Sequence, residues 1–358
     1  MADTLDLAIL DANKEEAIAY GRCNSDIAVA NLPLDKQFSD LHKFRLRIDR
    51  ALRGIENRPP VNELTNYGHD LFNFCIRGEL ANLYNRLPAT HVRIHILSNH
   101  PDVQAIPWEY LQEPHQNPGP PSERSIVRIV QMLGRPAPTP LQLGKQIRVL
   151  FASAEPTDQE PVSWPDVQDE IEATFRARLD RIGRFEFTAV NGATRTDLLD
   201  ALTQQPCDIF HYSGHGEVDK GVGYLILTDR TTRRSVRLRA DELGLILAGR
   251  DIRLVVLSAC DTATGNFSND FSVTAEAIVR AGVPAVVANQ LPVPDKTVAT
   301  FVAAMYRELL NNGGDIDKAV GAGRLRLAID LGSSPEAVLE WGIPAIYRHI
   351  AAAQIFKP

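Results

Sequence analysis

The chain has 358 residues, of which 44% are hydrophobic and 23% charged, and its formal net charge is −7. This composition is typical of a globular protein of about two domains, and it excludes a disordered tail, a collagen-like repeat and a disulfide scaffold. The acidic balance argues against a dedicated nucleic-acid binder, because phosphate contacts need concentrated basic residues.

The first part of the chain combines helical and strand patterns. Helical spacing of apolar residues predicts helices over 34–52 and 61–85, and apolar runs predict strands near 92–98 and 125–133. These elements indicate a smaller α/β unit. A Pro- and Gly-rich stretch over 134–144 can continue neither a helix nor a central strand, and a buried-strand pattern follows it at once. We therefore expect two domains, residues 1–144 and 145–358.

The second part alternates between short apolar strands and amphipathic helices. Strands are expected at 147–154, 185–190, 208–214, 253–259 and 284–290. Helices are expected at 167–179, 195–204, 240–247, 273–281 and 295–311. Strands that are apolar on both faces and alternate with helices predict a mostly parallel sheet with helices on both sides.

Two of these strands end in unusual loops. His215 lies between two glycines directly after the strand at 208–214, and Cys260 directly follows the strand at 253–259. Functional groups of open α/β sheets collect at the carboxyl ends of the strands. If the two strands are neighbours, the imidazole and the thiol lie side by side, as a nucleophile and its base require.

The motifs HYSGHG and LSACDTATG, followed by VTAEAIVRAGVPAVVANQLPVPD, resemble the CHAT family of caspase-like cysteine peptidases. IPWEYL, at residues 106–111, resembles the Pro-Trp-Glu segment of that family. The resemblance runs from about Leu64 to about Arg326. It implies a caspase-like sandwich in which a non-catalytic α/β half precedes the catalytic half, and our boundary near residue 144 fits that division.

The same resemblance implies the site. The catalytic pair falls on His215 and Cys260, and the backbone N–H groups of Gly216 and Cys260 fall on the oxyanion hole. Asp261 and the segment Asn289–Gln290–Leu291 fall where substrate-binding residues are expected. Ala259 departs from the metacaspase pattern, which has Asp before the nucleophile, so the acidic determinant for a basic P1 residue is missing. The family implies neither a metal nor another cofactor.

The remaining candidates favour structural roles. His211 alternates with apolar residues inside a strand, and Cys207 begins the same strand. Cys23 and Cys75 lie in helical patterns and are interpreted as packing residues. His91, His95 and His100 lack the spacing of a metal site. The basic run at 228–239 is interpreted as a solvated hairpin that an acidic partner could also contact.

The resemblance therefore implies a cysteine endopeptidase that cleaves a partner protein encoded nearby, controlled either by a separate regulatory activator or by its own flexible loops. By family resemblance, its setting is bacterial defence or programmed cell death, for example the activation of a gasdermin-like pore former. The alternative is a catalytically silent caspase-fold module that docks partners. A nucleotide-binding protein is disfavoured, because no phosphate-binding glycine motif follows the first strand. The sparse cysteines and the acidic N-terminus favour a cytoplasmic location without membrane contact.

Overall fold

The computed structural model describes residues 3–11, 13, 15–86, 90–98, 100–114, 124–130, 139–142, 146–179, 185–261, 272–332 and 339–357. The expected domain boundary near residue 144 lies outside these residues. Among the described helices, none combines the length and hydropathy that a membrane span needs.

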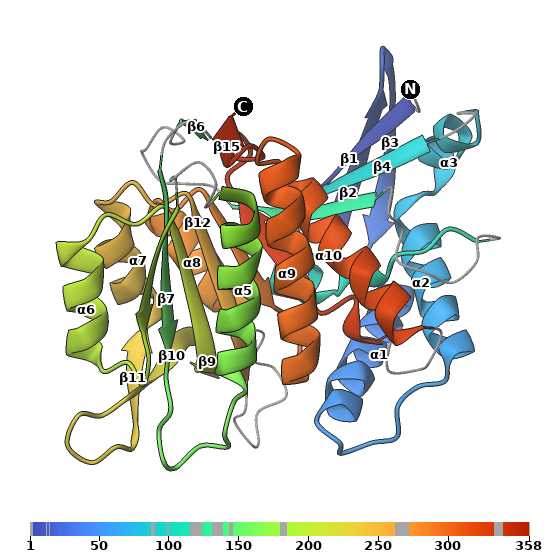
Figure 1. The fold of residues 1–358 in the computed structure, drawn as a ribbon. Helices are drawn as coiled ribbons and strands as arrows, with labels where there is room; N and C mark the ends of the chain where they lie inside the picture. The colour runs from blue at the N-terminus through green and yellow to red at the C-terminus, as the bar shows by residue number, and fades with distance from the viewer. Residues whose placement is uncertain are drawn as a thin grey trace.

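Within the described residues, thirteen strands form one sheet (Figure 1). The main path runs β11-β10-β9-β12-β13-β14-β5-β4-β1-β2-β3, and β7 pairs with β8 and with the first part of β9. The strands are β1 (Asp3–Asp11), β2 (Glu16–Cys23), β3 (Asp26–Pro33), β4 (Thr90–Ile96), β5 (Arg124–Ile129), β7 (Ile147–Ser153), β8 (Phe185–Val190), β9 (Ile209–Asp219), β10 (Val222–Thr228), β11 (Ser235–Arg239), β12 (Leu254–Asp261), β13 (Ala285–Asn289) and β14 (Pro344–Arg348). A separate pair joins β6 (Leu141–Gln142) to β15 (Phe356–Lys357).

Helices cover both faces of the sheet around β9, β12 and β13 (Figure 1). One layer holds α5 (Trp164–Leu179), α9 (Asp295–Asn311) and α10 (Ile316–Leu331), and the other holds α6 (Arg195–Gln204), α7 (Ala240–Ala248) and α8 (Ser272–Ala281). Alternate strand residues pack into the two layers, since Val256 belongs to one buried cluster and its neighbour Val255 to the other. The predicted α/β fold with a mostly parallel, doubly covered sheet is confirmed.

The N-terminal part contains a three-stranded antiparallel meander, β1–β3, that the sequence patterns did not predict. Its helices are α1 (Lys36–Leu52), α2 (Val61–Cys75), α3 (Gly78–Asn85), α4 (Pro101–Ala105) and the short 3₁₀ turn η1 (Trp108–Tyr110). Cys23 ends β2, so the helical pattern expected around it is wrong. Cys75 ends α2 as expected, and both side chains are buried.

Strand β14 connects the two parts of the sheet. It pairs antiparallel with β13 on one side and parallel with β5 on the other. One buried hydrophobic cluster likewise contains Leu5 of β1 and Val287 of β13. The sheet and its core are therefore continuous between the segments before and after residue 144, and a separate N-terminal half stays a prediction.

Candidate active site

The parallel strands β9 and β12 bring the two predicted catalytic positions together. The strands are parallel neighbours, and the register pairs Cys260 with His215 and Asp261 with Gly216. Strand alternation places position 215 on the same face as His211, and position 260 on the same face as Ser258. The expected pairing of the two strands is confirmed. The loops expected directly after residues 214 and 259 are wrong, because β9 continues through His215 to Asp219 and β12 includes Cys260. Nothing is described of the side chains of Cys260 and Asp261.

The His215 side chain is 3% exposed, and a main-chain carbonyl contacts its ring. Nε2 lies 2.7 Å from the carbonyl oxygen of Glu160, in the loop between β7 and α5. A carbonyl oxygen only accepts hydrogen bonds, so Nε2 must carry a proton. In the neutral ring, Nδ1 is then the basic nitrogen. The sequence gives no signal for this contact, because any residue type carries a carbonyl.

The loop that carries Glu160 is held by the β10–β11 hairpin. The Asp158 carboxylate accepts hydrogen bonds from the Ser235 backbone N–H at 2.7 Å, the Ser235 hydroxyl at 3.0 Å and Arg234 Nε at 3.3 Å. Partial burial opposes ionisation, but the bonds from Ser235 and Arg234 outweigh it and lower the pKa of Asp158. Two bonds from Thr157 to the Arg233 carbonyl add to this attachment.

Arginines of the basic run at 228–239 have acidic partners within the chain. Arg234 pairs with Asp158, Arg237 pairs with Glu217 and Arg239 pairs with Asp241. The run lies in the expected hairpin, formed by β10 and β11. Its charge is therefore largely balanced internally.

The spacing of HYSGHG has a local structural reason. The Tyr212 hydroxyl lies 2.6 Å from the carbonyl oxygen of Ile226 and 3.1 Å from that of His215, so it ties the His215 backbone to β10. A Cβ atom at position 214 would lie 2.5 Å from this hydroxyl. Gly214 is thus needed for Tyr212 to reach past it and support His215.

His211 is a core histidine, in agreement with the structural interpretation. Nδ1 lies 3.0 Å from the Tyr306 hydroxyl and Nε2 lies 2.9 Å from the Ser258 hydroxyl. Burial lowers the pKa of His211 to about 3. The ring is consequently neutral near pH 7, with both nitrogens bonded to side-chain hydroxyls.

The expected substrate-binding segment lies one strand away, at the end of β13. The register between β12 and β13 ends with Leu257 paired to Ala288, and Asn289 is the next residue along β13. Asn289 is buried, and its Nδ2 has no hydrogen-bond partner among the described residues. The Gln290 amide bonds towards the interior, and Leu291 packs in the core. Substrate contact by these residues stays a prediction.

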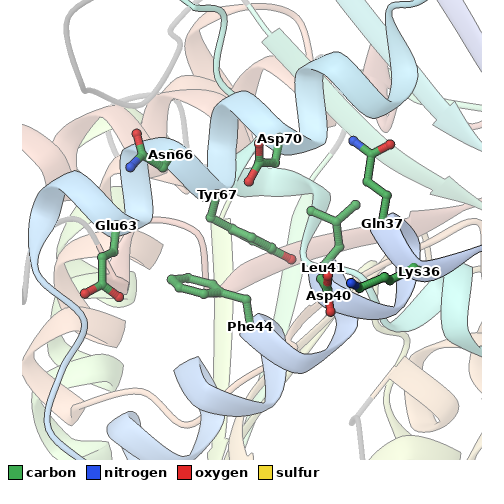
Figure 2. A pocket seen from close by; sticks show the side chains of 9 residues that line it. All are labelled: Lys36, Gln37, Asp40, Leu41, Phe44, Glu63, Asn66, Tyr67 and Asp70. Atoms are coloured by element: carbon green, nitrogen blue, oxygen red, sulfur yellow. The ribbon is translucent and has the colours of Figure 1, made fainter.

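A separate cavity of about 560 Å³ lies between α1 and α2 (Figure 2). The stacked rings of Phe44 and Tyr67 line it together with carboxylates. Two of these, Asp40 and Glu63, pair with Lys43 and Arg47. None of the lining residues belongs to β9, β12 or β13. Within the described ranges, no group of three or more His, Cys, Asp or Glu side chains is arranged to hold a metal ion.

Comparisons with known proteins agree with this architecture. The family model described as the CHAT domain matches residues 65–347. The comparison with curated proteins found no match. The separase–securin complex of Saccharomyces cerevisiae matches with a TM-score of 0.51 and 13% identity, over 97% of this chain and 30% of the matched chain. This chain thus spans less than a third of that relative, and the likeness concerns the fold alone.

Two further solved structures match with lower scores. RgpB of Porphyromonas gingivalis, solved as a complex of its pro- and mature domains, has a TM-score of 0.47 and 13% identity, over 89% of this chain and 78% of that chain. Caspase-1 of Spodoptera frugiperda has a TM-score of 0.36 and 16% identity, over 61% of this chain and 93% of that chain.

Proposed function

Because this chain belongs to the CHAT-domain family, whose model spans residues 65–347, we propose that it is a cysteine endopeptidase that cleaves a specific partner protein. The single observation that carries the proposal is the register of β9 and β12, which places Cys260 directly opposite His215. The carbonyl of Glu160 supports it, because that contact defines which imidazole nitrogen is basic.

The reaction is acyl transfer. Nδ1 of His215 accepts the thiol proton, and the Cys260 sulfur attacks the scissile carbonyl carbon. The backbone N–H groups of Gly216 and Cys260 stabilise the oxyanion. His215 then donates its proton to the leaving amine as the C–N bond breaks, which gives a thioester. Water attacks the thioester, releases the acid product and restores the thiol.

The proposal includes a setting. The substrate is a protein encoded nearby, in bacterial defence or programmed cell death, for example a gasdermin-like pore former. The separase match was solved with securin bound; by analogy, a separate regulatory protein controls this chain. A cytoplasmic location supports the chemistry, since the nucleophile must remain a reduced thiol.

The test is co-expression with the products of neighbouring genes, followed by mass-spectrometric mapping of new N-termini. The expected result is a cut in one neighbour that Cys260→Ala abolishes. The matched control is Cys207→Ala, which removes a buried thiol away from the site and is expected to leave the cut intact. A cut that persists in Cys260→Ala contradicts the assignment. No cut, together with a Cys260 that reacts no faster than a free thiol, favours the docking module instead.

A further inference from the structure

A buried polar cluster joins the Pro-Trp-Glu segment to the loop after β13. Glu109 and Arg128 have no exposed side-chain surface. Arg128 binds the Glu109 carboxylate with both terminal nitrogens, and Nη2 lies 3.1 Å from Oε2. Arg324 of α10 lies 3.5 Å from the same carboxylate and also binds the carbonyl of Pro344. The cluster thus contains groups from both parts of the chain.

Gln290 completes this cluster with its whole side-chain amide. Nε2 donates to Glu109 Oε2 at 2.6 Å and to the Gly342 carbonyl at 2.8 Å, and Oε1 accepts from Arg128 Nη2 at 2.8 Å. The backbone N–H of Gln290 donates to the Ile343 carbonyl at 3.0 Å. An amide suits this position because it donates to a carboxylate and accepts from a guanidinium at the same time.

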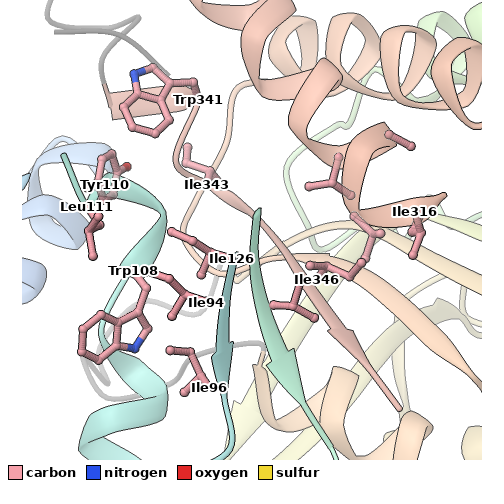
Figure 3. Close-up of a cluster of buried hydrophobic side chains, with 14 of the residues drawn as sticks. Ile94, Ile96, Trp108, Tyr110, Leu111, Ile126, Ile316, Trp341, Ile343 and Ile346 are labelled. Atoms are coloured by element: carbon pink, nitrogen blue, oxygen red, sulfur yellow. The ribbon is translucent and has the colours of Figure 1, made fainter. Parts of the chain in front are cut away.

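Charge and packing make the cluster rigid. Burial raises the pKa of Glu109, but Arg128 and Arg324 outweigh it, so the net shift is downward and the carboxylate stays ionised. Aromatic and aliphatic side chains surround the segment (Figure 3). The rings of Tyr110 and Trp341 are 5.4 Å apart, and Trp108 Nε1 donates to the Val103 carbonyl at 2.8 Å. Removing one partner from such a buried network is costly.

The position of Gln290 links the cluster to the candidate active site. It directly follows Asn289, and β13 pairs with β12 up to Leu257, three residues before Cys260. Packed interiors transmit small displacements rather than absorb them. A displacement of Gln290 is therefore expected to displace the end of β12, where Cys260 lies.

We propose that Gln290, Glu109 and Arg128 are positioning residues, forming a latch by which the Pro-Trp-Glu segment holds the loop after β13 in the conformation that receives the substrate chain. The inference rests on the proposed peptidase function. It assigns a role to a segment far from the nucleophile in sequence, and it makes substrate acceptance depend on the N-terminal part of the chain.

The test uses the full chain and three variants. Gln290→Met keeps the volume of the side chain and removes its hydrogen bonds. Gln290→Glu places a second carboxylate against Glu109, and the double variant Glu109→Gln with Gln290→Glu exchanges the two groups while it keeps one negative charge beside Arg128. The matched control is Gln354→Met, which removes a glutamine–carbonyl bond to Gly313, between α9 and α10.

Two readouts separate the latch from the chemistry. Hydrogen exchange over residues 286–293 reports the loop and needs no substrate. A set of peptidyl acyloxymethyl ketones with varied P1 residues is first screened on the unmodified chain, and the ketone that modifies Cys260 fastest is kept. Its rate of Cys260 modification is then compared, in each variant, with the rate of Cys260 alkylation by iodoacetamide. The ketones must occupy the substrate site, whereas iodoacetamide need not.

We expect Gln290→Met to speed exchange over 286–293 and to slow the peptidyl ketone by about 10-fold or more, with iodoacetamide alkylation nearly unchanged. Gln290→Glu is expected to slow the peptidyl ketone more than Gln290→Met does, and the double variant is expected to recover part of the lost ketone rate. Exchange and ketone rates equal to those of the Gln354→Met control overturn the latch. If Cys260 of the unmodified chain reacts with neither reagent, the peptidase proposal fails, and unchanged exchange in Gln290→Met would overturn the latch separately.

Discussion

Two histidines four residues apart on β9 differ in the hydrogen-bond partners of their rings. His211, in the middle of the strand, bonds through its two ring nitrogens to the hydroxyls of Tyr306 and Ser258. His215 lies two residues beyond Ser213, the last residue of β9 that pairs with β7. Its Nε2 bonds to the Glu160 carbonyl. A hydroxyl can donate or accept, so the partners of His211 accommodate either neutral tautomer. A carbonyl accepts only, so the partner of His215 selects one.

This comparison shows what separates a core histidine from a candidate base. Both rings are buried, so burial alone does not distinguish them. The difference lies in the defined tautomer of His215 and in its register position opposite Cys260. His211 is instead paired with Val256, an apolar residue of β12, the strand that also carries Cys260.

The largest expected effect separates the two histidines by activity. His215→Ala removes the base and is expected to lower Cys260-dependent cleavage by roughly 10²–10⁴-fold. His211→Asn keeps a hydrogen-bonding group near the Nδ1 position and is expected to change the rate far less. The measurement is the cleavage rate of the substrate identified by N-terminus mapping. Equal losses in the two variants would contradict the comparison.

The next effect concerns stability in acid. Unfolded His211 takes up a proton near its ordinary pKa of 6.5, whereas in the folded chain burial lowers this pKa to about 3. Between these values the unfolded state binds more protons, so the free energy of unfolding falls as pH falls, by up to ~1.4 kcal/mol per pH unit from this group.

Urea unfolding between pH 7.5 and 4.5 measures this dependence. His211→Asn is expected to be less stable than the unmodified chain at pH 7.5, because the Tyr306 and Ser258 contacts are disturbed. Its stability should also decline less steeply as the pH falls. Parallel pH profiles for the two proteins would show that His211 is protonated when folded.

A smaller effect is expected from the attachment of the Glu160 loop. Asp158→Ala removes the bonds from Ser235 and Arg234, so the carbonyl is held less firmly against His215. We expect about a 10-fold loss of kcat with a smaller change of KM, because misplacement of a catalytic group acts mainly on the chemical step. The matched control, Asp241→Ala, removes an Asp–Arg pair at the start of α7 without touching the loop. An equal loss in the control would assign the effect to general loosening.

Local patterns predicted the fold best where the elements are regular. The helices α6 and α9 and the strand β8 begin and end at the predicted residues. In α6, Thr194 and Asp197 form a reciprocal N-terminal cap. Strand β1 of the meander carries a signal that could predict it, since Leu5, Leu7 and Ile9 alternate with period two.

The sequence patterns predict no element after residue 311, where α10, β14 and β15 lie. Glycine lowers helix propensity, and α10 contains Gly321 and Gly323. A Cβ atom at position 323 would lie 2.6 Å from the Phe301 ring, so this glycine permits close packing of α10 on α9. Tertiary packing therefore overrides the local preference.

The site divides in the same way. His215 and Cys260 are predictable because their residue types carry the chemistry and each directly follows a buried apolar run. The continuation of β9 through His215 to Asp219 is not predictable from that run. The Glu160 carbonyl has no residue-type signature. The inward amide of Gln290 depends on Glu109, which lies 181 residues earlier in the chain. Contacts of this kind follow only from the assembled sheet.

Site-resolved alkylation of the four cysteines by iodoacetamide across pH 5.5–8.5 tests directly whether His215 activates Cys260. The side chains of Cys23, Cys75 and Cys207 are buried, and burial raises the pKa of Cys207 to about 12, so they serve as unreactive internal controls. We expect Cys260 alone to react, with a rate that persists below the ordinary thiol pKa near 8.5, and we expect His215→Ala to remove this persistence. A Cys260 rate that follows an ordinary thiol and is unchanged by His215→Ala would contradict the pairing of His215 with Cys260.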